Sequence, residues 1–265
     1  MFIKCLVENT HNIKDELESK HGLCFYIETK HHKLLFDLGP NDLFYKNALK
    51  AGIDISQVDT VIISHGHYDH GGGLATFLKY NSKATIYIQK SAYEAHYSKA
   101  SFLIVPIGIN ANFMNHPQVK LCHGHTVIDS ELELFTAEGN ILPSPMNKTL
   151  LGPDKTPDDF NHEHSLLIKE NKTVLFTGCS HKGIFNILNS VKKMYPNIDV
   201  VIGGFHLYNP ATKKTADNAY LKDFKKELDQ YPEIFYTCHC TGEVAYNYLK
   251  SEQVKYISCG EELEA

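Results

Sequence analysis

Residues 58–73 read V-D-T-V-I-I-S-H-G-H-Y-D-H-G-G-G, and this stretch decides how the 265-residue chain is interpreted. The apolar, β-branched run Val61–Ile63 predicts a short buried strand. A helical pattern begins at Leu74, directly after three glycines. Between the strand and the helix lie four ligand-type residues, His65, His67, Asp69 and His70.

This spacing suits a pair of divalent metal ions. Positions i and i+2 of an extended turn point the same way, so we expect His65 and His67 to bind one ion. Asp69 and His70 fall on the next part of the turn and are expected to bind a second ion. Imidazole and carboxylate groups bind zinc-like ions at about 2.0–2.2 Å, and paired ions roughly 3.5–4 Å apart activate water. The glycines are expected to let the backbone pass close to the ions. A histidine-rich surface loop is the alternative.

The pattern His65-x-His67-x-Asp69-His70 after an apolar strand resembles the signature of the metallo-β-lactamase-fold superfamily. The resemblance implies an α/β (α+β) fold, a four-layer αββα sandwich with a one- or two-metal site at one edge. We expect residues 1–265 to form a single domain of this fold, with an insertion around residues 99–160 that covers the active site. The resemblance also implies that Asp37, at the end of an early strand, supports the metal loop.

A second buried strand, Val174–Thr177, is followed by Gly-Cys-Ser-His. Members of the superfamily usually carry an aspartate at this strand end, where Cys179 stands here. A thiolate binds zinc at about 2.3 Å. We therefore consider His181 or Cys179 as the third ligand of the first ion, and we favour His181. His162, before the preceding strand, is an alternative for the same position.

Two later strand ends complete the predicted site. His206 follows the buried strand that begins at Asp199, and we interpret it as a substrate-binding group or a general acid/base. A core histidine bonded to a backbone carbonyl is the alternative. His239 matches the last histidine of the superfamily pattern and is expected to bind the second ion with Asp69 and His70. The flanking Cys238 and Cys240 are expected to point away from the metal site. We predict that Asp69 and His206 are the catalytic residues.

Three further motifs narrow the resemblance: T-G-C-S-H at 177–181, G-G-F-H-L at 203–207 and C-H-C-T-G at 238–242. With the first stretch, they resemble the branch that contains the archaeal dihydropterin–ribofuranosylaminobenzene phosphate synthase and many metal-dependent hydrolases. This implies a hydrolase that uses a metal-bound hydroxide on an ester, phosphoester or amide. One alternative is a synthase that joins a dihydropterin diphosphate to a ribofuranosylaminobenzene phosphate, and another is a non-enzymatic ligand-binding protein. Two zinc ions are the favoured cofactor, with manganese or iron as alternatives.

The composition is ordinary for a soluble globular protein. Apolar residues make up 43% of the chain, charged residues 22%, and the net charge is −5. Because the lysines are scattered, the chain shows no nucleic-acid surface, and a small-molecule substrate is expected. Seven cysteines without C-x-x-C pairs indicate a reducing, cytoplasmic environment. We find no signal peptide and no apolar segment long enough to span a membrane. The oligomeric state is not indicated.

Some local predictions concern the chain around the site. Residues 91–98 are predicted to be helical, with Ser91 as N-cap and Glu94 completing a capping box. Residues 9–20 are expected to form a loop or a short exposed helix. Residues 99–118 and 140–160 are expected to form a wall that faces the substrate.

Overall fold

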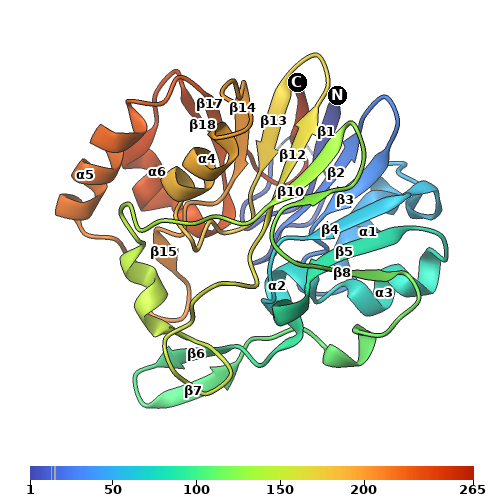
Figure 1. The fold of residues 1–265 in the computed structure, drawn as a ribbon, viewed down its shortest axis with the longest axis horizontal. Coiled ribbons are helices and arrows are strands. Elements are labelled where there is room, and N and C mark those ends of the chain that lie inside the picture. Colours follow the sequence, from blue (N-terminus) through green and yellow to red (C-terminus); the bar gives the residue numbers. More distant parts are fainter. Residues whose placement is uncertain (13, 15) are drawn as a thin grey trace. The chain divides into compact units, whose positions relative to one another are not determined.

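The computed structural model describes residues 1–12, 14 and 16–265, which form two compact units (Figure 1). The first unit contains Met1–Glu94, Ile107–His123 and Ile257–Ala265, and the second contains Ala95–Pro106 and Gly124–Tyr256. Each unit has one seven-stranded sheet with helices packed against it. The predicted α/β class is confirmed. Of the segment 9–20, predicted as loop or short helix, residues 13 and 15 lie outside the described part of the chain.

The sheet of the first unit has the strand order β19-β1-β2-β3-β4-β5-β8. Strand β1 pairs antiparallel with both β2 and β19, whereas β3, β4, β5 and β8 are parallel. All four residues of β4 are buried, which is why this strand reads as an uninterrupted apolar run. The strands are β1 Phe2–Val7, β2 Cys24–Glu28, β3 Lys33–Phe36, β4 Thr60–Ile63, β5 Thr85–Gln89, β8 Val119–Cys122 and β19 Glu262–Glu264.

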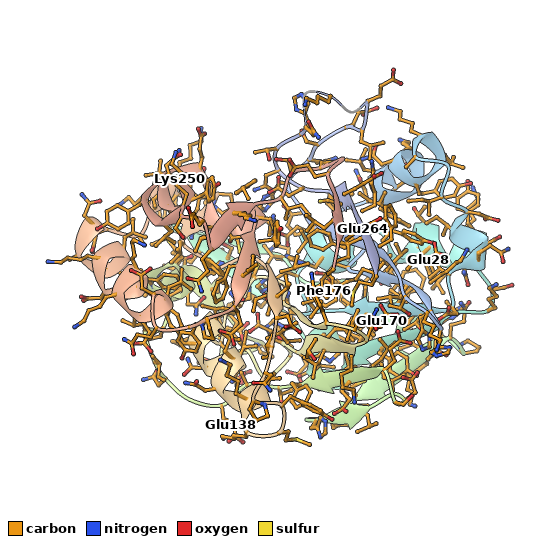
Figure 2. The ribbon with its side chains drawn as sticks, turned by 90° about the horizontal axis from the view of Figure 1, so that it is seen from above. Glu28, Glu138, Glu170, Phe176, Lys250 and Glu264 are labelled. Carbon is orange, nitrogen blue, oxygen red and sulfur yellow. The ribbon has the colours of Figure 1, made fainter. Side chains whose placement is uncertain are left out.

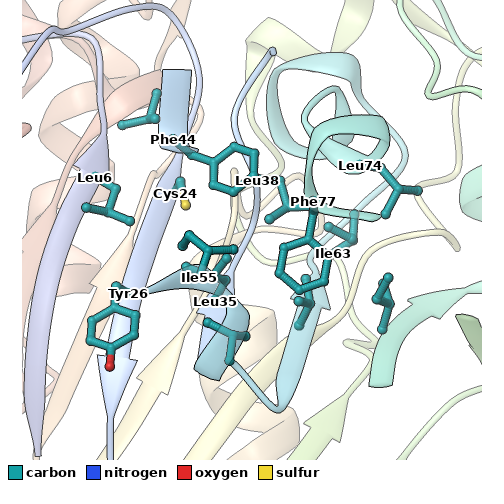
Figure 3. Close-up of a cluster of buried hydrophobic side chains, with 14 of the residues drawn as sticks. Leu6, Cys24, Tyr26, Leu35, Leu38, Phe44, Ile55, Ile63, Leu74 and Phe77 are labelled. Atoms are coloured by element: carbon teal, nitrogen blue, oxygen red, sulfur yellow. The ribbon is translucent and has the colours of Figure 1, made fainter. Parts of the chain in front are cut away.

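Helices α1 (Leu43–Lys50) and α3 (Leu74–Tyr80) pack on this sheet (Figure 3). Their fully buried rings, Phe44 and Phe77, join the same cluster as Ile63 of the central strand. Burying a side chain of this size stabilises the fold by roughly 1.5–3 kcal/mol. The unit also contains α2 Tyr68–Gly71 and the 3-10 turns η1 Ile55–Gln57, η2 Lys90–Tyr93 and η3 Ala111–Phe113.

The sheet of the second unit has the order β18-β17-β14-β13-β12-β10-β9, and its first four strands are parallel. Three helices pack their apolar faces on it, and Phe176 of β13 is fully buried while Lys250 and Glu138 are exposed (Figure 2). The elements of this layer are β9 Thr126–Val127, β10 Leu132–Phe135, β12 Ser165–Lys169, β13 Thr173–Phe176, α4 Ile184–Lys192, β14 Val200–Gly203, α5 Asn218–Leu228, β17 Ile234–Thr237, η5 His239–Thr241, α6 Glu243–Leu249 and β18 Val254–Tyr256.

The second unit also contains small sheets. Strands β6 (Tyr97–Ala100), β7 (Leu103–Pro106) and β11 (Leu150–Leu151) form one in the order β11-β6-β7. The other pairs β15 (Tyr208–Asn209) with β16 (Lys214–Thr215), and η4 spans Pro145–Thr149. All of β7 is exposed.

The predicted helix over residues 91–98 is wrong. The structure has the short turn η2 up to Tyr93, an extended Glu94, and then β6. Residues 97–100 pair with β7 on one side, and Tyr97 and Ser98 pair with β11 on the other. These hydrogen bonds are made with residues distant in the chain, and they outweigh the local capping signal.

The segment 99–160, predicted as an insertion, supplies strands to both large sheets. Residues 119–122 form β8 of the first unit, and residues 132–135 form β10 of the second. The rest of the segment is mostly loops, turns and the hairpin β6–β7. The single-domain organisation and the covering role of this segment stay predictions. Among the described residues, no helix combines the length and apolarity needed to cross a bilayer.

Candidate metal centre

Nine of the described non-glycine residues have left-handed backbone angles, and four of these follow strands that lead to the predicted site. Asp37 follows β3 with φ of 62°, Ser180 follows β13 with 56°, His206 follows β14 with 48°, and His239 follows β17 with 49°. Such conformations cost of order 1–3 kcal/mol each and concentrate at functional sites. They therefore indicate the same strand ends that the sequence motifs select.

In the first unit, the loop after β4 brings the predicted ligands of one ion together. Nε2 of His65 and Nδ1 of His67 lie 3.1 Å apart, and both side chains are buried. Two ligands of a tetrahedral zinc ion lie roughly 3.3 Å apart when each bond is about 2.0–2.1 Å. The pair therefore has the spacing that shared coordination requires.

Helix α2 carries the other two predicted ligands of this loop. Nε2 of His70 lies 3.8 Å from Oδ2 of Asp69. The same Asp69 oxygen lies 3.1 Å from Nε2 of His21. His21 was not predicted as a site residue, because it stands in a loop without a motif and far in sequence from the metal signature.

Asp37 supports this loop as expected, and its contacts explain how. It is fully buried, and Oδ1 accepts a hydrogen bond from the backbone N–H of Ser64 at 2.7 Å. Oδ2 accepts from Oγ of Ser64 at 2.8 Å and from Nδ1 of His70 at 2.6 Å. Because Nδ1 of His70 donates its proton, Nε2 carries the lone pair, which is the tautomer needed for metal binding.

Two of the three glycines after His70 serve close backbone packing. A Cβ on Gly72 would lie 2.3 Å from the carbonyl oxygen of Pro40 and 2.4 Å from that of Tyr68. A Cβ on Gly73 would lie 2.3 Å from the carbonyl oxygen of Leu38. The glycines were expected to let the backbone approach the ions, whereas in the structure Gly72 and Gly73 let the loop lie against residues 38–41.

Gly72→Ala is therefore expected to destabilise the protein by about 3 kcal/mol, because a backbone carbonyl cannot rotate away from the added methyl group. Urea unfolding of metal-free protein measures the effect. Gly152→Ala is the control, since its Cβ would meet nothing closer than 3.9 Å, and it should change stability by less than about 0.5 kcal/mol. Equal stabilities for the two variants would contradict the packing explanation.

In the second unit, the parallel strands β13, β14 and β17 end at one edge, and the ligand-type residues meet there. One donor atom each from Cys179, His181 and His206 lie within 4.8 Å of one another. The same holds for Cys179, His239 and Cys240. All five side chains are buried.

Cys240 does not point away from this cluster, so that expectation is wrong. Its Sγ accepts a hydrogen bond from the backbone N–H of His206 at 3.3 Å, and it occupies space where a Cβ on Gly204 would come within 2.4 Å. Burial by itself would raise the pKa of the thiol. Two effects outweigh burial and lower the pKa of the Cys240 thiol well below its usual value. One is a hydrogen bond with Cys179, and the other is the interaction with the nearby imidazoles of His206 and His239. A thiolate is the form that binds metal.

His181 is held from several sides. Its Nδ1 lies 3.2 Å from Oδ1 of Asn147, and its ring stacks on Phe160 with centroids 4.6 Å apart. Its backbone N–H, like that of Lys182, donates to the buried carboxylate of Glu163, at 2.7 Å and 2.8 Å. Burial raises the pKa of Glu163 to about 7, although these two N–H groups favour its charged form. The sequence analysis missed Glu163 and Asn147 because neither belongs to a motif.

The imidazole of His206 lies beside that of His181, with ring centroids 4.2 Å apart. Among the described residues, neither ring nitrogen of His206 has a hydrogen-bond partner, although the side chain is buried. Its backbone carbonyl accepts from Oγ of Ser144. A buried imidazole that lacks partners is costly, so a metal ion or a substrate group fits this position better than a core histidine does.

His162 has a different set of neighbours. Its Nε2 lies 3.3 Å from Oδ2 of Asp158, and its ring packs against His96 with centroids 4.0 Å apart. These contacts account for its burial, and its alternative role as a ligand in place of His181 stays a prediction. Asp158 and His96 belong to no recognised motif and were not predicted as site residues.

Ligand-type side chains at the carboxyl ends of strands, in two α/β units, define an α/β protein with a candidate metal centre. Residues 20–229 match the family described as the metallo-beta-lactamase superfamily. The chain belongs to this superfamily, and the predicted resemblance is confirmed.

Relatives and solved structures cover nearly the whole chain. The uncharacterized protein MJ0448 of Methanocaldococcus jannaschii is 28% identical over 246 residues, which are 91% of this chain and 90% of the relative. The 7,8-dihydropterin-6-methyl-4-(beta-D-ribofuranosyl)-aminobenzene-5'-phosphate synthase of the same organism is 24% identical over 94% of this chain and 90% of its own. The crystal structure of Tm1679, a metal-dependent hydrolase of the beta-lactamase superfamily, superposes with a TM-score of 0.80 at 28% identity over 100% of this chain and 99% of that one.

Proposed function

We propose that the chain is a metal-dependent hydrolase that cleaves an ester, phosphoester or amide bond of a small-molecule substrate. Two divalent ions, zinc by preference, would serve as cofactors. The proposal agrees with the superfamily of the chain and with the hydrolase whose structure resembles it. The proposed ligands are His65, His67 and His181 or Cys179 for one ion, and Asp69, His70 and His239 for the other.

The observation that carries the proposal is the gathering of donor atoms at strand ends. Cys179, His181 and His206 bring theirs within 4.8 Å of one another, and His206 offers a buried imidazole that lacks partners among the described residues. Imidazole, thiolate and carboxylate groups form a donor set that suits zinc and also iron. When bound, a divalent ion acts as a Lewis acid and lowers the pKa of a coordinated water to about 7.

The side chains around the donors have separate tasks in this proposal. Asp37 fixes the tautomer and orientation of His70. Glu163 holds the loop that carries His181. His206 binds the substrate or moves a proton, since imidazole exchanges protons near neutral pH.

A synthase reaction is the second candidate, because the synthase of Methanocaldococcus jannaschii aligns with 94% of this chain. Under this alternative, the site would bind a dihydropterin diphosphate and join it to a ribofuranosylaminobenzene phosphate. Titration of the metal-loaded protein with a dihydropterin tests it by fluorescence. Absence of pterin binding at millimolar concentration would exclude the synthase.

We also propose that the protein works in the cytoplasm. All seven cysteines are buried, and none of them forms a disulfide bond. Structural disulfides are usual in small secreted domains and rare in a reducing cytosol. The absence of disulfides among these seven residues supports the reducing compartment, in which Cys179 and Cys240 would stay reduced.

The metal content of protein purified without chelators or a histidine tag tests the proposed centre. We expect two equivalents of zinc, manganese or iron per chain, and activity on at least one ester, phosphoester or amide in a substrate panel. Elemental analysis and the panel supply the two readouts. A protein that takes up no metal, even after incubation with each ion, would instead support a non-enzymatic ligand-binding role.

A further inference from the structure

Asn147 makes two contacts with His181, and both residues belong to the second unit. Its Nδ2 donates a hydrogen bond to the backbone carbonyl of His181 at 2.8 Å. Its Oδ1 lies 3.2 Å from Nδ1 of the imidazole of the same residue. The side chain of Asn147 therefore connects the turn η4 with the loop that follows β13.

The turn η4 is itself held at both ends. Ser144 is its N-cap, and a proline follows at the first position of the turn. A serine N-cap followed by proline is a pattern that starts a helical turn. Oγ of Ser144 also donates to the backbone carbonyl of His206. At the other end, Oγ1 of Thr149 accepts a hydrogen bond from Nδ2 of Asn209 at 2.8 Å, so Asn147 lies between two fixed points.

The backbone carbonyl of His181 fixes the orientation of the Asn147 amide. If the amide were turned over, Oδ1 would face the carbonyl oxygen at hydrogen-bond distance, and neither atom could donate a proton. Oδ1 therefore faces the imidazole. Because an amide oxygen only accepts, Nδ1 of His181 must donate. In the neutral imidazole, Nε2 then carries the lone pair, which is the form that binds a metal ion.

Phe160 places a second constraint on the imidazole of His181. The two rings are stacked, with an interplanar angle of 4°. Stacking restricts the plane of the imidazole but does not select its edge, because a half-turn about the Cβ–Cγ bond keeps the plane and replaces Nδ1 with a C–H group. The contact with Asn147 supplies this selection, since Oδ1 requires a nitrogen that carries a proton.

We propose that Asn147 is a positioning residue, which holds His181 with Nε2 available for a metal ion. The proposal rests on the proposed function, and it selects His181 rather than Cys179 as the third ligand of the first ion. A group that accepts a hydrogen bond from the other nitrogen of a metal-binding imidazole fixes the orientation of the ring and raises its basicity.

The tautomer of His181 in metal-free protein tests the proposal. Nitrogen NMR of the imidazole identifies it at a pH about two units above the usual imidazole pKa of about 6.5. We expect the Nδ1–H form in the unaltered protein. In Asn147→Leu we expect mainly the Nε2–H form, which prevails for histidine in water. Asn147→Asp should restore the Nδ1–H form, because a carboxylate oxygen also accepts from Nδ1. The signals of His181 are assigned by their absence from His181→Gln.

Asn209→Leu is the matched control, because Asn209 holds the same turn through Thr149 rather than through His181. Oδ1 of Asn209 also accepts hydrogen bonds from the backbone N–H groups of residues 211 and 212, at 2.9 Å and 3.1 Å. The control should therefore destabilise the fold at least as much as Asn147→Leu does, as measured by urea unfolding, and leave the tautomer of His181 unchanged. Competition with a chelator should show zinc affinity roughly 10–100-fold lower in Asn147→Leu and nearly unaltered in the control.

An Nε2–H tautomer of His181 in the unaltered protein would overturn the proposal, and this measurement needs no variant. An Nδ1–H tautomer that persists in Asn147→Leu, or an equal change in Asn209→Leu, would also overturn it. The tautomer is measured in metal-free protein, so its outcome stands whether or not the unaltered protein binds metal. Failure of the unaltered protein to bind metal or to hydrolyse any substrate would instead contradict the proposed function, so the two failures are distinguishable.

Discussion

His65→Ala is expected to remove one metal equivalent and to slow hydrolysis of any responsive substrate by at least about 10³-fold. A bound metal supplies several kcal/mol of transition-state stabilisation, and each 1.36 kcal/mol corresponds to a factor of ten in rate. Nε2 of His65 lies 3.1 Å from Nδ1 of His67, so the variant removes half of a ligand pair. Elemental analysis and kcat/KM measure the two effects.

His31→Ala is the control for this experiment, because His31 lies exposed in the turn between β2 and β3. It should retain the metal content and the rate of the unaltered protein. Full hydrolytic activity in His65→Ala would show that the proposed mechanism is wrong, whatever the metal content.

Asp37→Ala is expected to lower the free energy of unfolding by about 3–5 kcal/mol, because it leaves a buried network without its acceptor. Ser64 loses the acceptor of two hydrogen bonds and His70 loses that of one. The left-handed backbone at this position adds a further cost for alanine. Metal affinity should fall roughly 10–100-fold, as is usual when a group that orients a ligand is lost.

Urea unfolding of metal-free protein isolates the stability effect of Asp37→Ala from the effect of bound metal. Competition with a chelator measures the affinity. Asp59→Ala is the control, since Asp59 pairs with Nδ1 of His32 at 2.9 Å but is partly exposed, and it should cost about 1 kcal/mol. If Asp37→Ala were no more damaging than Asp59→Ala, the support assigned to Asp37 would be wrong.

The sequence predicts the strands that carry the site because their apolar runs are continuous. Val61–Ile63 lies within β4, and the predicted strands before Cys179, His206 and His239 are β13, β14 and β17. Parallel strands buried on both faces require such runs, and polar residues directly after them then stand out. The candidate metal ligands in the motifs could be predicted from the sequence because they directly follow these apolar runs.

Contacts made across long stretches of chain could not be predicted in the same way. Strand β6 depends on pairing with residues 103–106 and 150–151, and no local sequence pattern predicts this strand. His96 meets Asp158 only because that pairing brings the start of β6 to the loop before β12. The direction of Cys240 depends on the space left by Gly204, which is a matter of packing rather than of spacing.

Strand β1 lies between β2 and β19, and Nζ of Lys4 reaches Oε1 of Glu262 across 258 residues of sequence. During translation, β1 therefore remains an edge strand, with unpaired backbone groups, until residues 262–264 have been made. The strands of the second large sheet all precede residue 257 and are available earlier. We therefore expect the first unit to be most open to aggregation while β1 lacks this partner.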